Sequence, residues 1–408
     1  MAVLRAYRPL FSVPGAARFI VGAAVGRLAA AMFGISTVVM VASRHDSYGL
    51  AGAVSAVGLL VLAILAPVIG GVLDRRGQRT VAIPLVSFST VMLMVLVVCS
   101  IAGAPVWTLF ASYALSAGIP SLGTMSRARW NEIFRGDDER LHVAMSLEQV
   151  LDELSFVIAP VLAVVTSTLI LPEAGIIIAA TGYLAGTLLF CSARSSEPPV
   201  VPHHDRPVGF AITRPGLLLV ALVMALTGVV FGSNEVVTIA VADSAGHEGF
   251  SSVILGLFAL GSAVSGLFFG LRSFRSSIVA RLVVGVGLMF LLEIPVLLAT
   301  NLWALAAVMA VAGIATAPTL ITSMGLAQRL VPTAMLNEGM TIVLTGLLVG
   351  ISAGSAVGGA AVERYGAHPA YLVPVAAGAG ALVIALLGWR ALARADRRRP
   401  MSGSLVRG

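Results

Sequence analysis

The stretch GGVLDRRGQR, residues 70–79, ends one long apolar segment and begins another. Glycine permits a tight reversal of the chain, and arginines mark the side of a membrane on which a loop stays. Those two properties alone would describe many short loops between membrane helices. They leave Asp74 unexplained, an acid at the edge of an apolar segment with Gly70 four residues before it and Gly77 three residues after it.

The composition around this stretch is that of a membrane protein. Of 408 residues, 58% are hydrophobic and 11% charged, with a mean hydropathy of +0.99, so a soluble fold would lack polar surface. About twelve apolar segments are long enough to cross about 30 Å of hydrocarbon, and their Ala, Leu, Val and Gly favour helices over barrel strands. We therefore expect an all-α membrane protein with spans near 16–41, 49–73, 80–102, 105–127, 142–167, 174–193, 215–241, 250–271, 277–299, 302–327, 333–360 and 367–393.

The longest polar interruption, residues 194–214, divides the chain nearly in half. We expect an N-terminal six-helix bundle at 1–193, a cytoplasmic linker at 194–214, a second six-helix bundle at 215–393 and a basic cytoplasmic tail at 394–408. The linker contains His203 and His204 without a third ligand nearby, so a solvated loop is favoured over a metal site. The halves also resemble each other as parallel repeats do: Glu148 follows Ala-Met in the first, and Glu338 follows Ala-Met in the second.

The basic residues indicate the orientation in the membrane. All 26 are arginines. Arg44 and Arg364 fall in loops on one side, Arg27 lies within an apolar segment, and the other 23 belong to the opposite side. The positive-inside rule then places both termini in the cytoplasm and explains the net charge of +7 without a nucleic-acid partner. The arginine-only, alanine-rich composition is typical of a high-GC bacterial genome, so the inner membrane of a bacterium is expected.

Residues 70–79 resemble the G-x-L-a-D-R-x-G-r-k loop that the major facilitator superfamily carries between its second and third spans. The resemblance extends over the whole chain through the spans, the central linker and the similarity of the halves. It implies the major facilitator fold, with two pseudo-symmetric six-helix bundles and transport by alternating access. It also implies a conformational latch that closes the cytoplasmic side, in which Asp74 faces the positive N-terminal end of the eleventh span. The latch residues are Gly70, Asp74, Arg75, Gly77 and Arg79.

Charged residues within the spans are the candidates for coupling transport to protons. Arg27 lies about ten residues into the first span, or roughly 15 Å, and Asp152 lies at a similar depth in the fifth. Because these two helices border the central cavity in the superfamily's fold, we expect an Arg27–Asp152 pair with Glu148 nearby. Two interpretations stay open. The cluster is purely structural, or protonation of Glu148 or Asp152 releases Arg27 and couples a proton gradient to transport.

In the second half, Asn234 and Glu235 are the candidates for the substrate cavity, since seventh helices line the cavity in this fold. A lone acid there attracts a cationic substrate, although Glu235 is equally compatible with a hydrogen bond to a neighbouring helix. Glu293 is a weaker candidate because ninth helices are peripheral in the superfamily. Glu338 begins the eleventh span, where the helix dipole favours an acid and no further role is required.

Two features of the first half bear on the kind of transporter and on the membrane boundary. Proton-coupled exporters of this superfamily carry Gly-Pro followed by further glycines in the fifth span, whereas residues 159–163 here read APVLA. Pro160 is kept and is expected to kink the helix, but the glycines are lost. At the end of the fourth span, Arg127, Arg129 and Trp130 are typical of a helix that reaches the lipid headgroups.

The chain has no lysine, which excludes any lysine-dependent nucleotide site in this polypeptide, and no feature resembles an enzyme or a cofactor site. We expect a secondary active transporter that moves a small molecule by alternating access, as a proton-coupled exporter working by antiport. Membrane lipid, protons and the substrate are its expected partners, and the expected oligomeric state is a monomer. The alternatives are an importer, by proton symport or facilitated diffusion, and a non-transporting receptor or scaffold on the same fold.

Overall fold

The computed structural model describes residues 2–45, 47–200, 210–247, 250–272, 274 and 276–397. Within these ranges the regular structure is entirely helical, so the predicted all-α class is confirmed. The chain divides into two compact units, residues 1–206 with 266–273 and residues 207–265 with 274–408. The division between 206 and 207 falls inside the predicted linker, whose His203 and His204 lie outside the described residues.

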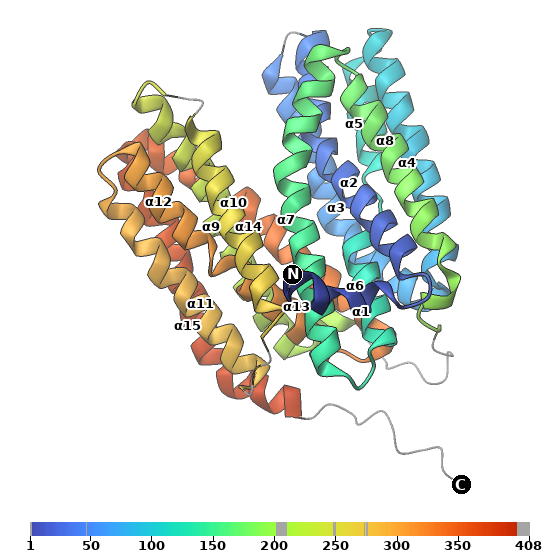
Figure 1. Ribbon diagram of the computed structural model, residues 1–408. Helices are drawn as coiled ribbons and strands as arrows, with labels where there is room; N and C mark the ends of the chain where they lie inside the picture. The colour runs from blue at the N-terminus through green and yellow to red at the C-terminus, as the bar shows by residue number, and fades with distance from the viewer. Residues whose placement is uncertain are drawn as a thin grey trace. The chain divides into compact units, whose positions relative to one another are not determined.

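The first unit is a bundle built around the long helix α2 (Figure 1). Helix α2 packs against α8 and α7, and α4 covers the other side of α8. A short amphipathic helix, α1, precedes the bundle and was not predicted from the sequence. The elements are α1 (Ala2–Phe11), α2 (Ala16–His45), α3 (Tyr48–Arg76), α4 (Gln78–Ile101), α5 (Val106–Ser116), α6 (Leu122–Ile133), α7 (Asp138–Leu169), α8 (Ala174–Ser192) and the 3₁₀ turn η1 (Arg194–Ser196).

The second unit is organised around the close pair α9 and α14, with α15 and α13 also against α9. Its helix α15 extends to Arg397, so the first residues of the predicted tail are helical. The elements are η3 (Ala211–Thr213), α9 (Pro215–Ser244), α10 (Phe250–Phe269), α11 (Ile278–Glu293), η4 (Ile294–Leu298), α12 (Leu302–Gly313), α13 (Thr316–Leu330), η5 (Thr333–Met335), α14 (Leu336–Tyr365), η6 (Pro369–Tyr371) and α15 (Leu372–Arg397).

Eleven helical segments of the described chain are long and apolar enough to cross a membrane, and α5 adds a shorter apolar helix. The predicted fourth span, 105–127, is therefore two helices, because the chain leaves helical geometry between α5 and α6. Pro120 lies in this break and has no N–H for a helical hydrogen bond. The predicted tenth span, 302–327, is divided in the same way between α12 and α13. Interrupted helices thus occupy corresponding places in the two halves.

The loop within residues 70–79 is a one-residue connection between two helices. Gly77 alone separates α3 from α4, with φ of 89°, a region that glycine adopts without a steric cost. Its N–H donates to the Leu73 carbonyl at 2.9 Å, which closes the last turn of α3. The N–H of Arg79 in the first turn of α4 donates to the Glu197 carboxylate at 2.9 Å, so an acid from beyond η1 caps this helix.

Helix α14 approaches α9 through glycines spaced four residues apart. Gly346, Gly350, Gly354 and Gly358 lie on one face of the helix, where a spacing of four keeps residues in line. A methyl group added at Gly346 would lie 2.6 Å from the Ala221 carbonyl oxygen, and one at Gly358 would lie 3.1 Å from a backbone carbon of α9. In lipid, where water does not drive helices together, such close backbone contact supplies much of the packing energy.

Arg44, which was predicted to lie on the other side of the membrane from most of the arginines, forms an ion pair. Its Nε lies 2.5 Å from the Glu173 carboxylate, which is almost fully buried at the start of α8. The hydrogen bond from the Arg44 guanidinium holds the pKa of Glu173 below its ordinary value. The pair joins the end of α2 to the beginning of α8 and neutralises both charges.

Candidate functional site

Arg27 is held inside the first unit by the close contact of α2 with α8. A methyl group added at Gly186 of α8 would lie 2.6 Å from the Gly26 nitrogen and 2.8 Å from the Gly22 oxygen of α2. Only glycines on both helices allow this approach. The next residue along α2 is Arg27, whose exposure is 8%. A guanidinium buried in this way needs acids and hydrogen-bond acceptors around it.

Two acidic residues of α7 provide the counter-charges and hydrogen-bond acceptors that Arg27 needs. The Arg27 guanidinium forms an ion pair with the Glu148 carboxylate, donates to the Glu148 backbone oxygen at 3.1 Å, and lies 3.2 Å from an oxygen of Asp152. The predicted Arg27–Asp152 pairing is therefore confirmed. Glu148 is a direct partner of Arg27 as well, because one turn of α7 separates the two acids and both reach the same guanidinium.

A second arginine completes the group and was missed in the sequence. Arg127 of α6 lies 2.6 Å from the second oxygen of Asp152. Gly123, one turn earlier, makes room for both guanidinium groups, since a methyl group there would lie 3.1 Å from Arg127 and 3.3 Å from Arg27. Two arginines and two acids give zero formal charge. We refer to Arg27, Arg127, Glu148 and Asp152 as the charge network.

The prediction that Arg127, Arg129 and Trp130 reach the headgroups is wrong. Their exposures are 2%, 0% and 0%. The break before α6 restarts the helix, and α6 then continues to Ile133, which places all three side chains within the unit. The Trp130 indole donates to Glu148 at 2.7 Å. The Arg129 guanidinium donates to Gln78, the Ala193 carbonyl and Ser196 at 2.7 to 2.8 Å and lies over the Phe190 ring.

The two acids of the network differ in how completely the protein encloses them. The side chain of Glu148 is fully buried and accepts hydrogen bonds from Ser126 at 2.6 Å and from Trp130, besides the ion pair with Arg27. The side chain of Asp152 is 22% exposed and lies between two guanidinium groups. Asp152 is therefore the less enclosed of the two acids. Neutralising Asp152 would leave the network with one excess positive charge.

The predicted latch residues surround the turn between α3 and α4. Gly70 is buried, Asp74 is half-buried on the last turn of α3, and Arg75 is exposed. The neighbouring Gln78, which the sequence did not single out, donates to the Met125 carbonyl at 2.9 Å and accepts from Arg129 at 2.8 Å. The turn is thus fastened to α6. A latch concerns a change between states, so the roles of Asp74, Arg75 and Arg79 stay predictions.

Pro160 lies within α7, and the chain is helical on both sides of it. Proline removes one backbone hydrogen bond of a helix and crowds the preceding turn. The predicted kink at this position stays a prediction.

Asn234 and Glu235, the predicted cavity residues of α9, lie on different faces of that helix. Consecutive helical residues are rotated by about 100°. Asn234 is 2% exposed, whereas Glu235 is exposed. An ionised carboxylate within an apolar span is expensive against lipid, so we expect water or a polar group at the Glu235 face. Substrate contact by either residue stays a prediction.

Glu338 has a structural partner that the sequence did not indicate. Its carboxylate accepts a hydrogen bond from the Ala211 N–H at 2.7 Å, and its exposure is 5%. The expectation that the helix dipole alone accounts for this acid is therefore incomplete. Glu338 fastens η3, at the end of the linker, to the first turn of α14.

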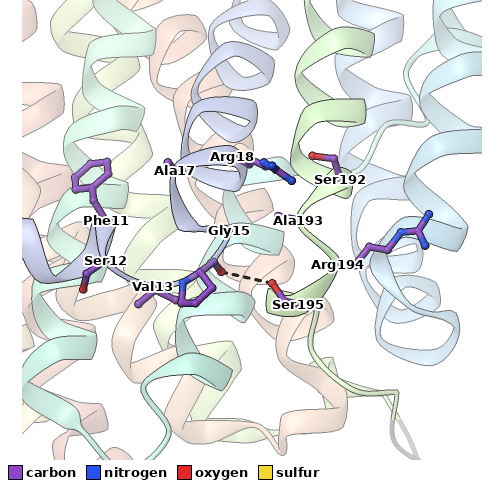
Figure 2. A pocket seen from close by; sticks show the side chains of 11 residues that line it. Phe11, Ser12, Val13, Gly15, Ala17, Arg18, Ser192, Ala193, Arg194 and Ser195 are labelled. Carbon is purple, nitrogen blue, oxygen red and sulfur yellow. Dashed lines mark hydrogen bonds between the residues drawn. The ribbon is translucent and has the colours of Figure 1, made fainter.

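An open depression of about 600 Å³ lies between the α1–α2 loop and the end of α8 (Figure 2). Arg18 and Arg194 line it and are both exposed, and Ser195 donates a long hydrogen bond of 3.5 Å to the Pro14 carbonyl. None of the network residues lines this depression. Within the described ranges, no group of three or more His, Cys, Asp or Glu is placed to hold a metal ion.

Comparisons with known proteins identify the fold. The family model described as Major Facilitator Superfamily matches residues 19–299, more than half of the chain. The human organic anion transporter MFSD10 (TETRAN) superimposes with a TM-score of 0.72 at 14% identity, over 90% of this chain and 98% of that one. A bacterial homologue of the iron transporter ferroportin, in an outward-facing state, gives 0.73 at 15%, over 92% and 99%.

A variant of the Escherichia coli fucose:proton symporter FucP gives a TM-score of 0.68 at 12% identity, over 92% of this chain and 99% of that one. A search of curated protein sequences finds no match. At these identities the solved structures carry information about the fold alone.

Proposed function

Because the chain belongs to the major facilitator superfamily, we propose that it is a proton-coupled secondary transporter that exports a small organic cation by antiport. Membership of the family implies secondary transport through a multi-pass membrane protein, driven by a gradient. The charge network carries the proposal of proton coupling. It holds two buried arginines and two acids at zero formal charge, and one carboxylate, Asp152, is only partly enclosed.

The coupling step we propose is protonation of Asp152. The ionised carboxylate attracts Arg27 and Arg127 together, whereas the neutral acid does not. Protonation would therefore weaken the attraction of α7 for α2, which carries Arg27, and for α6, which carries Arg127. Glu148 would keep its own ion pair with Arg27. A conformational equilibrium shifts only as far as a ligand binds its states differently, and the proton would be such a ligand here.

The cationic substrate is proposed from Glu235. It is an exposed acid on an apolar helix, and among the described residues no arginine or histidine forms an ion pair with it. A carboxylate that binds either a cation or a proton exchanges one for the other, which is the logic of antiport. Import by symport requires instead that proton and substrate bind together, and it is the alternative direction.

We further propose the inner membrane of a bacterium as the location, with both termini in the cytoplasm and a monomer as the working unit. The distribution of the arginines supports the orientation.

Asp152→Asn is expected to lower pH-driven accumulation by roughly tenfold while leaving exchange at equal pH intact, since allosteric coupling energies typically correspond to about 5- to 150-fold. The measurement is flux in proteoliposomes containing the full chain, with ethidium as the first probe and with or without a pH gradient. An organic anion, ferrous iron and fucose complete the panel. Glu153→Gln is the matched control, because Glu153 is the next acid on α7 and accepts a hydrogen bond from Gln149 instead.

Unchanged pH dependence in the Asp152→Asn protein would reject coupling at this residue. Accumulation of a probe in the direction of proton flow would favour the symporter. Flux of fucose, the anion or iron without ethidium flux would reject the cationic substrate. No flux of any probe by a correctly folded wild-type protein would favour the receptor or scaffold.

Asp74→Asn tests the proposed latch. We expect transport to fall by roughly tenfold, because removing about 1.4 kcal/mol from one conformation shifts its population by that factor. Insertion and melting temperature should be unchanged, since Asp74 is only half-buried. The exposed neighbour Arg76 provides the control variant Arg76→Gln. The measurement is initial flux per correctly inserted molecule, and wild-type flux in Asp74→Asn would exclude the latch.

A further inference from the structure

The second unit contains a buried acid that the charge network does not include. Glu293 is the last residue of α11 and is 1% exposed. Asn234 of α9 approaches its carboxyl group and is 2% exposed. The side chains three residues further along the chain from Asn234 and Glu293, Val237 and Val296, are apolar and fully buried. The ninth span, predicted to be peripheral, therefore turns this acid into the interior of the unit.

Three polar atoms at this place have no hydrogen-bond partner. They are one carboxyl oxygen of Glu293 and both the oxygen and the nitrogen of the Asn234 amide. The other elements packed here contribute Tyr371, whose hydroxyl pairs with Thr238 at 2.7 Å, and His368, whose ring centre lies 6.0 Å from that of Tyr371. Among the described residues, no arginine forms an ion pair with Glu293.

An ionised carboxylate is unfavourable in these surroundings. A buried charge without a counter-ion costs several kcal/mol, and a buried acid ordinarily becomes neutral instead.

The unpartnered atoms are complementary only when a proton is present. An ionised carboxylate and the Asn234 oxygen are all acceptors, so the amide oxygen finds no donor there. A protonated Glu293 donates its O–H to the Asn234 oxygen, and its other oxygen accepts from the Asn234 amide nitrogen. We infer that Glu293 and Asn234 form a proton-binding site in the second unit, with the proton carried by Glu293.

This site is separate from the one proposed at Asp152, and it stands whichever direction or substrate the transporter has. Release of the proton requires water to reach the carboxyl group, which is enclosed by α9, α11 and the apolar side chains around them. The site therefore exchanges its proton only when the helices that bury Glu293 and Asn234 move apart.

The test is infrared difference spectroscopy of the full-length protein in lipid nanodiscs at neutral pH. Subtracting the spectrum of Glu293→Gln from that of the wild type should leave one protonated-carboxyl stretching band per chain, with a deuterium shift. Asn234→Leu should move this band, because it removes the hydrogen-bond partner. Glu235→Gln is the matched control and should leave the band unchanged, since Glu235 is the adjacent acid on α9 and is exposed.

The spectra are recorded in sodium buffer and in N-methylglucamine buffer, because the same oxygens would suit a small monovalent cation. The same band in both buffers supports the proton. Absence of the band, or its loss when sodium is added, overturns the proposal. Glutamine reproduces the donor and acceptor of the neutral acid, so a lower melting temperature of Glu293→Gln at neutral pH also counts against it.

Discussion

Replacement of Arg27 by methionine is expected to destabilise the first unit by about 3–5 kcal/mol, the usual cost of removing one partner of a buried ion pair. Methionine keeps the length of the side chain but leaves Glu148 without its cation and Asp152 with Arg127 alone. The uncompensated charge, more than the lost contact, sets the size of the effect. Arg18→Met is the control on the same helix, because Arg18 is exposed, and it should change stability by less than about 0.5 kcal/mol.

The reporter for this measurement is Cys191, which is 1% exposed in α8 and becomes reactive on unfolding. Labelling by a thiol-reactive dye during heating, in a Cys99→Ala background, gives the melting temperature. The double variant Arg27→Met with Glu148→Gln should recover most of the loss, because Arg127 and Asp152 then remain as a neutral pair. Equal stability of Arg27→Met and wild type, or no recovery in the double variant, would show that the charges are independent.

Gly350→Ala is expected to have the largest effect in the second unit. The added methyl group would overlap the Ala225 carbonyl oxygen of α9, and backbone on both sides leaves no flexible side chain to give way. Overpacking a tight core costs about 1–3 kcal/mol, and we expect the upper end of that range. The helices would have to separate along the whole line of glycines on α14.

Gly256→Ala is the matched control for this variant. Gly256 lies in α10 of the same unit, and a methyl group there meets nothing within 4 Å. Because alanine is the better helix former by about 1 kcal/mol, this variant should be as stable as the wild type or slightly more so. The measurement is the fraction of monodisperse protein after heating in detergent, followed by size-exclusion chromatography. Equal loss in the two variants would mean that close packing of α9 and α14 is not what stabilises the unit.

Much of the fold is predictable because a bilayer imposes long apolar helices that the composition reveals directly. The breaks before α6 and between α12 and α13 were harder to locate, since a short interruption hardly changes the average hydropathy of a span. That omission led to the wrong environment for Arg127, Arg129 and Trp130. The glycines at 346, 350, 354 and 358 carried a readable spacing of four, a signal that could have identified the close helix pair.

The candidate site could likewise be predicted from the sequence only in part. An arginine inside an apolar span stands out by its cost, and helical depth matched Arg27 with Asp152 once the family resemblance brought the first and fifth spans together. The contribution of Arg127 depends on the rotation of α6 after its break and on the space left by Gly123, neither of which follows from local sequence. Glu293 and Asn234 are 59 positions apart and meet only because α13 and α15 pack against both α9 and α11.

The sequence by itself determined the membrane environment, the helical class, the family and the presence of charges that need partners, because each depends on local composition or on a short motif. The tertiary structure alone decided which charges meet and which acid stays partly exposed. Asp152 and Glu148 have similar neighbours along the chain, yet the side chain of one is 22% exposed and that of the other is fully buried. That difference arises because α2, α6 and α7 converge around the Arg27 guanidinium group. Burial of this kind is a property of packing and not of any single segment.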